Sequence, residues 1–270
     1  MSSRQPRSAL GANGSTSRRG SAVSALSVPV TNTFVADVQP TYTLRGVVRC
    51  VETINDRIAW TAEEDGTLKI RSLPKGTELK VLRGRPRTKC AALLYMEAQQ
   101  QLWAAFEDGF VRVYSVVQSE LVSEFSATET PGAAATALLE VEGMVFLAGE
   151  DGSLTQWDCQ SLRRLRALPG HLSSIRCLGC YMGPTGSVIF SGSDDSTVKA
   201  WDPYLESSNN SSSSGNCMFV FSGHRKGAVR AIEVVNAVNQ MWTAGDDATV
   251  RVWNLESLDC VAVLKGTPQL

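Results

Sequence analysis

The sequence lacks several features that mark specialised classes of protein. It has 2 histidines in 270 residues, and its net charge is −1. No stretch approaches the roughly 18 consecutive apolar residues that predict a transmembrane helix. Near-neutral charge gives no general attraction to nucleic acid or anionic membranes. Hydrophobic residues make up 43% of the chain and charged residues 20%. We therefore expect a globular protein with a sizeable core, no integral membrane association and no binding of nucleic acid through overall charge.

The 7 cysteines give no disulfide framework. Their number is odd and no secretory apolar segment opens the sequence, which predicts a reduced compartment, with the cytoplasm favoured and the nucleus possible. Cys177 and Cys180 form a C-x-x-C pair, a spacing found in zinc and redox sites, but no second pair completes it. Both lie on a predicted strand, where residues three apart point to opposite faces. We interpret them as buried structural cysteines and expect no metal site.

The first 40 residues differ in composition from the rest. They are rich in Ser, Gly, Ala and Arg, with Asp37 as the one acidic residue. Such a segment buries too little apolar surface to offset its ordering entropy, which predicts a disordered tail. Arg and Ser with few acids are also typical of mitochondrial transit peptides, but Pro6 and several glycines interrupt the amphipathic helix of such peptides. Mitochondrial import is not expected.

Beyond the tail, a turn motif repeats five times. Its acidic residues are Asp65, Asp108, Asp151, Asp195 and Asp247, at spacings of 43, 43, 44 and 52. The last interval is longer because it contains a Ser- and Asn-rich segment, 205–217, which we predict to be a flexible insert. The sixth residue after each Asp is Arg71, Tyr114, Trp157, Trp201 or Trp253. An offset that never varies indicates one structural unit in five copies.

Each unit predicts four short strands. The Asp-Gly or Asp-Asp pair is typical of a tight hairpin turn, and the alternation that follows it, as in 197–201, is typical of a half-buried strand. One apolar run precedes the turn, another lies further upstream, and a fourth follows. The predicted units span about 42–83, 84–126, 127–168, 169–222 and 223–266. The sequence therefore predicts an all-β domain over 41–270.

Two dipeptides make the pattern more specific. Glycine-histidine occurs at 170–171 and 223–224. The tryptophan six residues after the turn aspartate is followed by Asp at 157–158 and 201–202, and by Asn at 253–254. Over about 42–266 the chain resembles the WD40-repeat (WD-repeat) family. The fourth and fifth repeats match closely, whereas the first three depart from the pattern, with Gly84-Arg85 in place of Gly-His. The resemblance implies a WD40-type β-propeller with five recognisable four-stranded blades.

Five blades leave the closure of the ring open. Propellers have four to eight blades and those of this family commonly have seven. Three arrangements remain: a small five-bladed ring closed by a strand from residues 41–45, completion by a partner chain, or a chain that is one part of a longer polypeptide. An unclosed array would expose sheet faces and edges, a liability that natural proteins avoid. We favour an incomplete propeller, because the sequence stops at 264–270, just where a sixth repeat would begin with Lys265-Gly266.

The resemblance also implies buried hydrogen-bonded tetrads in the last two repeats. They are His171, Ser191, Asp195 and Trp201, and His224, Thr243, Asp247 and Trp253. Imidazole, hydroxyl and indole donors suit a buried carboxylate, which is costly without donors. The second and third repeats place Ala104 and Leu147 at the hydroxyl position and lack the histidine. We therefore expect the turn aspartates Asp108 and Asp151 to rely on backbone donors.

A charged ring is predicted at one end of the domain. The residue before each turn aspartate is acidic: Glu64, Glu107, Glu150, Asp194 and Asp246. In the resembling family this position lies beside the mouth of the central channel. The first strands carry Arg49, Lys89, Arg176 and Arg230 in positions taken as equivalent, and Thr136 breaks this series. The acids and bases either neutralise each other, or the bases contact an acidic or phosphorylated peptide.

Both histidines occupy the repeated structural position, so no catalytic triad is expected. The predicted function is a non-catalytic scaffold for protein–protein interaction and complex assembly, without cofactor, metal or small-molecule substrate. Two alternatives remain: a regulatory propeller segment of a larger enzyme, and binding of phosphoinositide or nucleic acid through a basic rim.

Overall fold

The computed structural model describes residues 47–73, 75–83, 88–168, 170–204, 217–225 and 227–266. The predicted tail, the candidate closing strand at 41–45, Gly84-Arg85 and nearly all of the predicted insert lie outside these ranges. The part of the chain that is described contains 20 strands and one short 3-10 helix, η1 (Asn236–Val238). None of its segments is a helix long and apolar enough to span a membrane.

The strands form five antiparallel sheets of four, here called blades 1 to 5 in chain order. Blade 1 holds β1 (Val48–Asn55), β2 (Ile58–Glu63), β3 (Leu68–Ser72) and β4 (Thr77–Leu82). Blade 2 holds β5 (Cys90–Met96), β6 (Gln101–Phe106), β7 (Phe110–Ser115) and β8 (Glu120–Ser126). Blade 3 holds β9 (Ala135–Val141), β10 (Met144–Gly149), β11 (Leu154–Asp158) and β12 (Arg164–Leu168). Blade 4 holds β13 (Ile175–Gly183), β14 (Gly186–Ser193), β15 (Thr197–Trp201) and β16 (Cys217–Ser222). Blade 5 holds β17 (Val229–Val235), β18 (Gln240–Gly245), β19 (Thr249–Asn254) and β20 (Cys260–Lys265).

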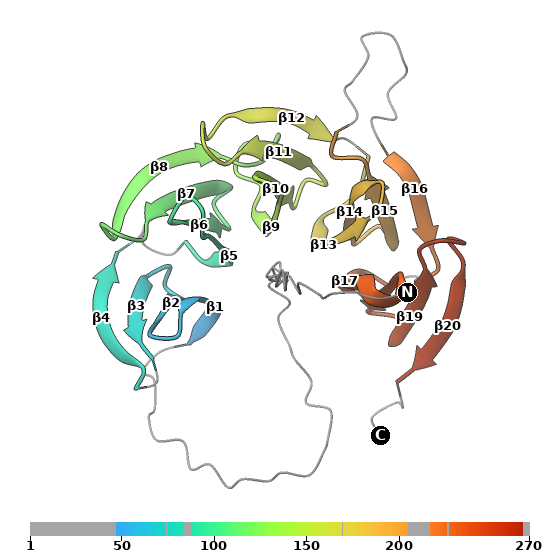
Figure 1. Ribbon diagram of the computed structural model, residues 1–270, viewed down its shortest axis with the longest axis horizontal. Helices are drawn as coiled ribbons and strands as arrows, with labels where there is room; N and C mark the ends of the chain where they lie inside the picture. The colour runs from blue at the N-terminus through green and yellow to red at the C-terminus, as the bar shows by residue number, and fades with distance from the viewer. Residues whose placement is uncertain are drawn as a thin grey trace, which may run out of the picture.

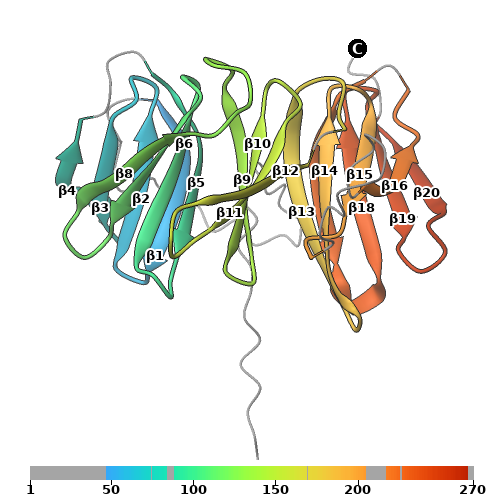
Figure 2. The ribbon, with the colours of Figure 1, turned by 90° about the horizontal axis from the view of Figure 1, so that it is seen from above.

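The blades stand side by side around one axis, as Figure 1 shows. The first strand of each blade lies nearest the axis and the fourth strand lies on the circumference. Seen from the side, the strands run across the thickness of the disc and the turns gather at its two ends (Figure 2). The all-β propeller with four-stranded blades, predicted from the repeat, is confirmed.

The turn between the second and third strands of each blade explains the Asp-Gly signature. The residue after the turn aspartate has a positive φ in all five blades. It is Gly66 (φ 84°), Gly109 (81°), Gly152 (79°), Ser196 (70°) or Ala248 (57°). Glycine adopts this left-handed conformation without the steric cost that a Cβ brings. The first three blades therefore use glycine, and the last two tolerate a small side chain.

Each blade is stabilised by the blade beside it. Four apolar clusters fill the described blades, and each takes its residues from two neighbours. Between blades 3 and 4, for example, Phe146 and Leu154 pack against Ile175 and Trp201, and all four are fully buried. Burial of a large apolar side chain contributes about 1.5 to 3 kcal/mol. Because a single sheet cannot cover its own faces, the blades are stable only as a stack.

The described blades form an arc with an open sector between blade 1 and blade 5 (Figure 1). They do not form the small closed five-bladed ring that was one of the predicted arrangements. The strand expected to close that ring falls outside the described residues. Completion by a partner chain and membership of a longer polypeptide stay as predictions.

One carboxyl group is buried between blades 1 and 2. The Glu52 side chain on β1 is 7% exposed and accepts a hydrogen bond from the Tyr95 backbone N–H at 3.4 Å. Burial raises the pKa of Glu52 from 4.5 to about 7. The folded protein therefore holds this proton more tightly than the unfolded chain does, so stability is lost as the pH rises from about 4.5 through about 7.

We predict that Glu52→Gln leaves the free energy of unfolding unchanged near pH 4. At about pH 8 it raises that free energy by on the order of 2 to 3 kcal/mol, because the neutral amide avoids burying a charge. Urea unfolding at the two pH values measures the effect. The exposed Glu97→Gln is the control and should change neither value. An equal effect of Glu52→Gln at both pH values would contradict the assignment.

Candidate functional site

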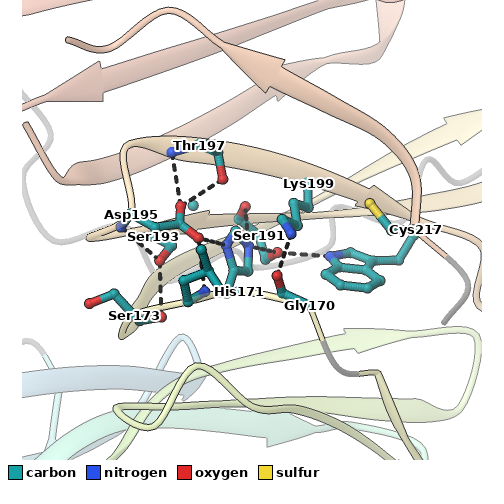
Figure 3. Close-up of polar contacts among 12 residues, drawn as sticks. Gly170, His171, Ser173, Ser191, Ser193, Asp195, Thr197, Lys199 and Cys217 are labelled. Carbon is teal, nitrogen blue, oxygen red and sulfur yellow. Dashed lines mark hydrogen bonds and ion pairs between the residues drawn. The ribbon is translucent and has the colours of Figure 1, made fainter. Parts of the chain in front are cut away.

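Blade 4 contains the complete tetrad (Figure 3). His171 Nδ1 lies 2.8 Å from Asp195 Oδ2, and His171 Nε2 lies 2.7 Å from Ser191 Oγ. The indole N–H of Trp201 donates to the same hydroxyl at 2.8 Å. Thr197 donates to Asp195 Oδ1 from its backbone N–H at 3.0 Å and from its hydroxyl at 2.6 Å. The four predicted residues therefore form one continuous hydrogen-bonded chain.

The direction of these bonds follows from their donors. Because the indole can only donate, the Ser191 hydroxyl accepts from Trp201. Because the Asp195 carboxylate can only accept, His171 donates to it from Nδ1. Burial by itself would raise the pKa of Asp195, but the hydrogen bonds from His171 and Thr197 hold that pKa well below its usual value. The carboxylate stays ionised and fixes the turn.

Blade 5 repeats this geometry. His224 Nδ1 lies 2.9 Å from Asp247 Oδ1, and His224 Nε2 lies 2.8 Å from Thr243 Oγ1. The Trp253 indole donates to Thr243 at 2.9 Å. Burial opposes ionisation of Asp247, but hydrogen bonds from His224 and Thr249 lower its pKa to about 2. Blades 4 and 5, whose repeats resemble the WD-repeat family most closely, thus contain the same hydrogen-bonded tetrad.

Blade 2 satisfies its turn carboxylate with a residue that sequence reasoning missed. Arg112 on β7 donates to Asp108 Oδ2 at 2.7 Å and to Glu124 Oε2 at 2.6 Å. Its guanidinium carbon lies 4.3 Å from the centroid of the Phe106 ring, and the residue is 2% exposed. A backbone donor, the N–H of Phe110, also reaches Asp108 at 3.1 Å. The expectation of backbone donors alone was therefore incomplete, because a buried guanidinium replaces the imidazole.

Blade 3 uses hydroxyl and backbone donors. Asp151 accepts hydrogen bonds from the N–H of Thr130 at 2.8 Å and from the N–H and hydroxyl of Ser153 at 3.0 and 2.5 Å. Thr128 occupies the place that the histidine has in blade 5. A Cβ on Gly149 would meet Thr128 at 2.8 Å, just as one on the equivalent Gly245 would meet the His224 ring at 2.6 Å. Asp151 is therefore ionised without an imidazole.

The hydroxyl of blade 3 comes from another strand. Leu147 fills the usual hydroxyl position on β10, and the Trp157 indole donates instead to Thr155 Oγ1 on β11, at 2.9 Å.

In blade 1, Arg71 takes the place of the tryptophan and donates to Thr61 Oγ1 at 3.0 Å and to Glu63 Oε1 at 2.8 Å. Its turn aspartate, Asp65, accepts from the N–H of Thr67 at 2.9 Å.

The five rim acids occupy equivalent positions. The backbone N–H of each one donates to a carbonyl just before, or at, the start of the first strand of its own blade. The bonds run from Glu64 to Val47, from Glu107 to Lys89, from Glu150 to Ala134, from Asp194 to Ser174 and from Asp246 to Ala228, at 2.8 to 2.9 Å. This repeated bond places an acidic side chain at the same end of every blade.

In each blade, the residue two places after the one whose carbonyl accepts this hydrogen bond lies at an irregularity in the pairing of the first strand. It is Arg49, Ala91, Thr136, Arg176 or Arg230. Such bulges redirect a side chain out of the regular alternation. The predicted equivalence of Lys89 with the three arginines is wrong, since Ala91 holds that position and Lys89 precedes the strand. Lys89 and Arg176 both lie 19 residues before their turn aspartates, but the β13–β14 hairpin is two residues longer than the β5–β6 hairpin, so equal offsets reach different positions in the register.

The cations of the rim are paired with its acids. Arg176 binds Asp194 through two nitrogens, with Nε at 2.9 Å and the terminal nitrogen at 2.5 Å. Arg230 binds Asp246 at 2.6 Å and reaches Asp194 of the neighbouring blade at 3.8 Å. On the other side of the arc, Arg49 contacts Glu64 at 3.3 Å and Glu107 at 3.1 Å, and Lys89 contacts Glu64 at 2.5 Å. Among the described residues Glu150 forms no direct ion pair, but it attracts Arg176 electrostatically at longer range.

The C-x-x-C pair lies on β13 with its two thiols in different interfaces. Cys177 packs against the cluster shared with blade 5, and Cys180 against the cluster shared with blade 3. Burial raises the pKa of Cys177 to about 12 and that of Cys180 to about 11. Both side chains are half-buried rather than fully buried. No group of three or more potential ligands among the described residues is arranged to hold a metal ion.

Sequence comparison matches two of the five repeats to a known family. The WD40 family, described as "WD domain, G-beta repeat", matches residues 162–202 and 215–254. Similar curated proteins include Mitochondrial division protein 1 of Kluyveromyces lactis, 27% identical over 42% of this chain and 16% of that protein. Pre-mRNA-splicing factor cwf17 of Schizosaccharomyces pombe is 27% identical over 42% of this chain and 30% of that protein. WD repeat-containing protein 1 of Gallus gallus is 34% identical over 35% of this chain and 14% of that protein.

A solved structure shares the fold. A chain in the crystal structure of the mitotic checkpoint complex superposes with a TM-score of 0.66 at 18% sequence identity, covering 83% of this chain and 64% of that one. This chain therefore spans less than two thirds of that chain, and less than a third of the length of each curated relative named above.

We predict that Thr243→Val destabilises the protein by about 1 to 3 kcal/mol. It removes the hydroxyl between His224 and Trp253 and leaves the indole N–H without its acceptor. Urea unfolding measures the loss. Thr77→Val on the exposed β4 makes the same chemical change and should cost less than about 0.5 kcal/mol. Equal losses in the two variants would contradict a stabilising role for the tetrad.

Proposed function

Because two of its repeats match the WD40 family and its strands form five equivalent blades, we propose that this chain serves as a non-catalytic scaffold that binds other proteins and assembles them into complexes. The observation that carries the proposal is the charged rim. Five equivalent acids and four cations are displayed at one end of a stack of blades, on turns whose backbone N–H groups donate to the turn aspartates. Rigid display of polar side chains on turns suits recognition of a macromolecular surface.

The buried tetrads support the absence of catalysis. A serine, a histidine and an aspartate are hydrogen-bonded in blade 4, as in a catalytic triad. However, Ser191 is 0% exposed and its hydroxyl also accepts the Trp201 indole N–H. A nucleophile must reach its substrate, and a fully buried hydroxyl held by a structural donor does not.

We also propose what the rim could bind and where the protein is located. Binding of an acidic or phosphorylated peptide by the rim cations would require that peptide to displace carboxylates already bound to them, at exposed pairs worth about 0 to 1 kcal/mol each. A regulatory role within a larger enzyme, and binding of phosphoinositide or nucleic acid, are the second and third candidates. We propose a cytoplasmic location, with the nucleus as the alternative. The seven free thiols support a reducing compartment, and fluorescence microscopy of a tagged chain tests it.

Reversal of two rim cations tests the scaffold function. In Arg176→Glu/Arg230→Glu, each new carboxylate faces the rim acids that the arginines contacted. We expect recovery of bound proteins to fall by about tenfold or more in affinity purification with quantitative mass spectrometry. Arg57→Glu is the matched control: Arg57 lies in the β1–β2 turn, at the opposite end of the strands. Unchanged recovery of every partner by the rim variant would count against this surface.

A further inference from the structure

Blade 5 turns an apolar face toward the open sector of the arc (Figure 1). Met241 and Trp253 pack against blade 4, so the residues that alternate with them along the strands point to the other side. Trp242 on that side is 37% exposed and Leu264 is 49% exposed, whereas the other five tryptophans of the chain are at most 6% exposed. Contiguous apolar residues exposed on a soluble protein mark interaction sites.

The same face occurs a second time in the molecule, on blade 2. Strand pairing places five residues of blade 5 at the sheet positions of five residues of blade 2, and the residue types are identical. The pairs are Ala92 and Ala231, Trp103 and Trp242, Ala105 and Ala244, Val111 and Val250, and Val113 and Val252. In both blades the indole N–H donates to the glutamine two residues earlier, Gln101 at 3.4 Å and Gln240 at 3.3 Å.

In blade 2 this face is covered by blade 3. Trp103 is 0% exposed and shares one apolar cluster with four residues of blade 3, which are Leu138, Val145, Leu147 and Trp157. The Phe125 ring lies between the two tryptophans, with its centroid 5.5 Å from that of Trp103 and 4.2 Å from that of Trp157. The surface that fits this face therefore has aliphatic residues on its first two strands and an aromatic residue on its third.

One position changes polarity between the two faces. Leu94 of blade 2 belongs to the cluster with blade 3, and the residue at the same sheet position in blade 5 is Glu233, which is exposed. A carboxylate covered by an apolar surface is costly unless it is paired. A sheet that covers blade 5 is therefore expected to place a basic side chain opposite Glu233.

Blade 1, on the other side of the open sector, does not offer the complementary surface. Arg71 stands where blade 3 has Trp157, and Thr61 stands where blade 3 has Leu147. Arg71 is bound to Glu63 at 2.8 Å, and Lys69 is bound to the same carboxylate at 2.9 Å. A second copy of this chain joined head to tail would bury these ion pairs against Trp242, at a cost in desolvation. This favours a different polypeptide as the occupant.

We propose that the blade 5 face, formed by Ala231, Trp242, Ala244, Val250 and Val252, docks a β-sheet of a partner protein. That sheet presents aliphatic and aromatic side chains as blade 3 does to blade 2, together with a basic side chain toward Glu233. The occupant is assigned from the identical face of blade 2 and from the surface that covers it. The assignment rests on the proposed scaffold function and adds an apolar docking surface separate from the charged rim.

A copy of blade 3 attached to this chain is the probe for the blade 5 face. The N–H of Gly266 donates to the Ala248 carbonyl as the N–H of Ala127 donates to the equivalent Gly109 carbonyl, so a copy of residues 127–168 can follow Lys265 in register. In the unmodified chain we expect acrylamide to quench about one of the six tryptophans, and this accessible fraction should be absent from Trp242→Phe. In the fusion the fraction should fall to the level of Trp242→Phe.

Two variants of the fusion control for its folding and for Glu233. Leu147→Glu in the copy alone puts a charge into the new interface and should leave Trp242 accessible to acrylamide. Glu233→Leu restores the residue of blade 2 and should preserve the protection. Circular dichroism shows whether each protein is folded. An accessible Trp242 in both the fusion and its Glu233→Leu variant, or equal protection by the Leu147→Glu copy, would overturn the proposal.

Two other occupants are tested on the purified chain of 270 residues. By light scattering we expect the mass of a monomer. A dimer that Trp242→Glu dissociates would mean that a second copy covers the blade 5 face, and would overturn the assignment to a partner. Protection of Trp242 in the full chain that is lost on removal of residues 1–40 would mean that the chain covers its own face, with the same consequence.

Partner recovery separates this surface from the rim. In affinity purification with quantitative mass spectrometry, we expect Trp242→Glu and the fusion to lose the same partner by about tenfold or more, because a tryptophan at the centre of an interface contributes strongly to affinity. If the reversal of Arg176 and Arg230 removes partners while these two proteins keep them all, the scaffold function stands and the blade 5 assignment is wrong. The opposite result would support the blade 5 face and count against the rim.

Discussion

The burial of apolar surface between neighbouring sheets is the constraint on which the structure depends. A four-stranded sheet has two faces, and in this chain each cluster is completed by the next blade. In blade 4, Trp201 faces the cluster shared with blade 3, while Phe190 faces the cluster shared with blade 5. Both side chains are essentially fully buried. Stacking of this kind fixes the angle and position of every blade, and so brings residues from distant repeats to one rim.

Within that stack, the turn aspartate is hydrogen-bonded by different donors in different blades. Every blade turns between its second and third strands on an aspartate; Asp65 of blade 1 is exposed, and in blades 2 to 5 the aspartate is half-buried, where its charge needs hydrogen-bond donors. Blades 4 and 5 use an imidazole, blade 2 uses the Arg112 guanidinium, and blade 3 uses hydroxyl and backbone donors. The backbone of the turn is preserved while the donors change. Degeneracy of the repeat in sequence therefore does not mean loss of the blade.

The same turns determine where charge is displayed. Because each rim acid is bound through its backbone N–H to the start of its own blade, its side chain is held at the mouth of the disc. Arginines aimed by strand bulges then pair with these acids, within a blade and across the boundary to the next, as Arg230 does with Asp246 and Asp194. These pairs reduce the charge available to a ligand.

The sequence by itself determined the repeat and the four-stranded unit, because these depend on fixed offsets along one chain segment, and its resemblance to the WD-repeat family implied the members of both tetrads. Ser191 and Trp201, for example, lie on paired strands of one hairpin, where the indole N–H donates to the hydroxyl. The tertiary structure alone decided which donor replaces histidine in blades 2 and 3, that Ala91 and not Lys89 holds the bulge position of blade 2, and which rim acid lacks a direct ion pair. These depend on strand register and on contacts between blades, where a one-residue bulge redirects a side chain and a partner comes from another blade, as Glu107 does for Arg49 across 58 residues.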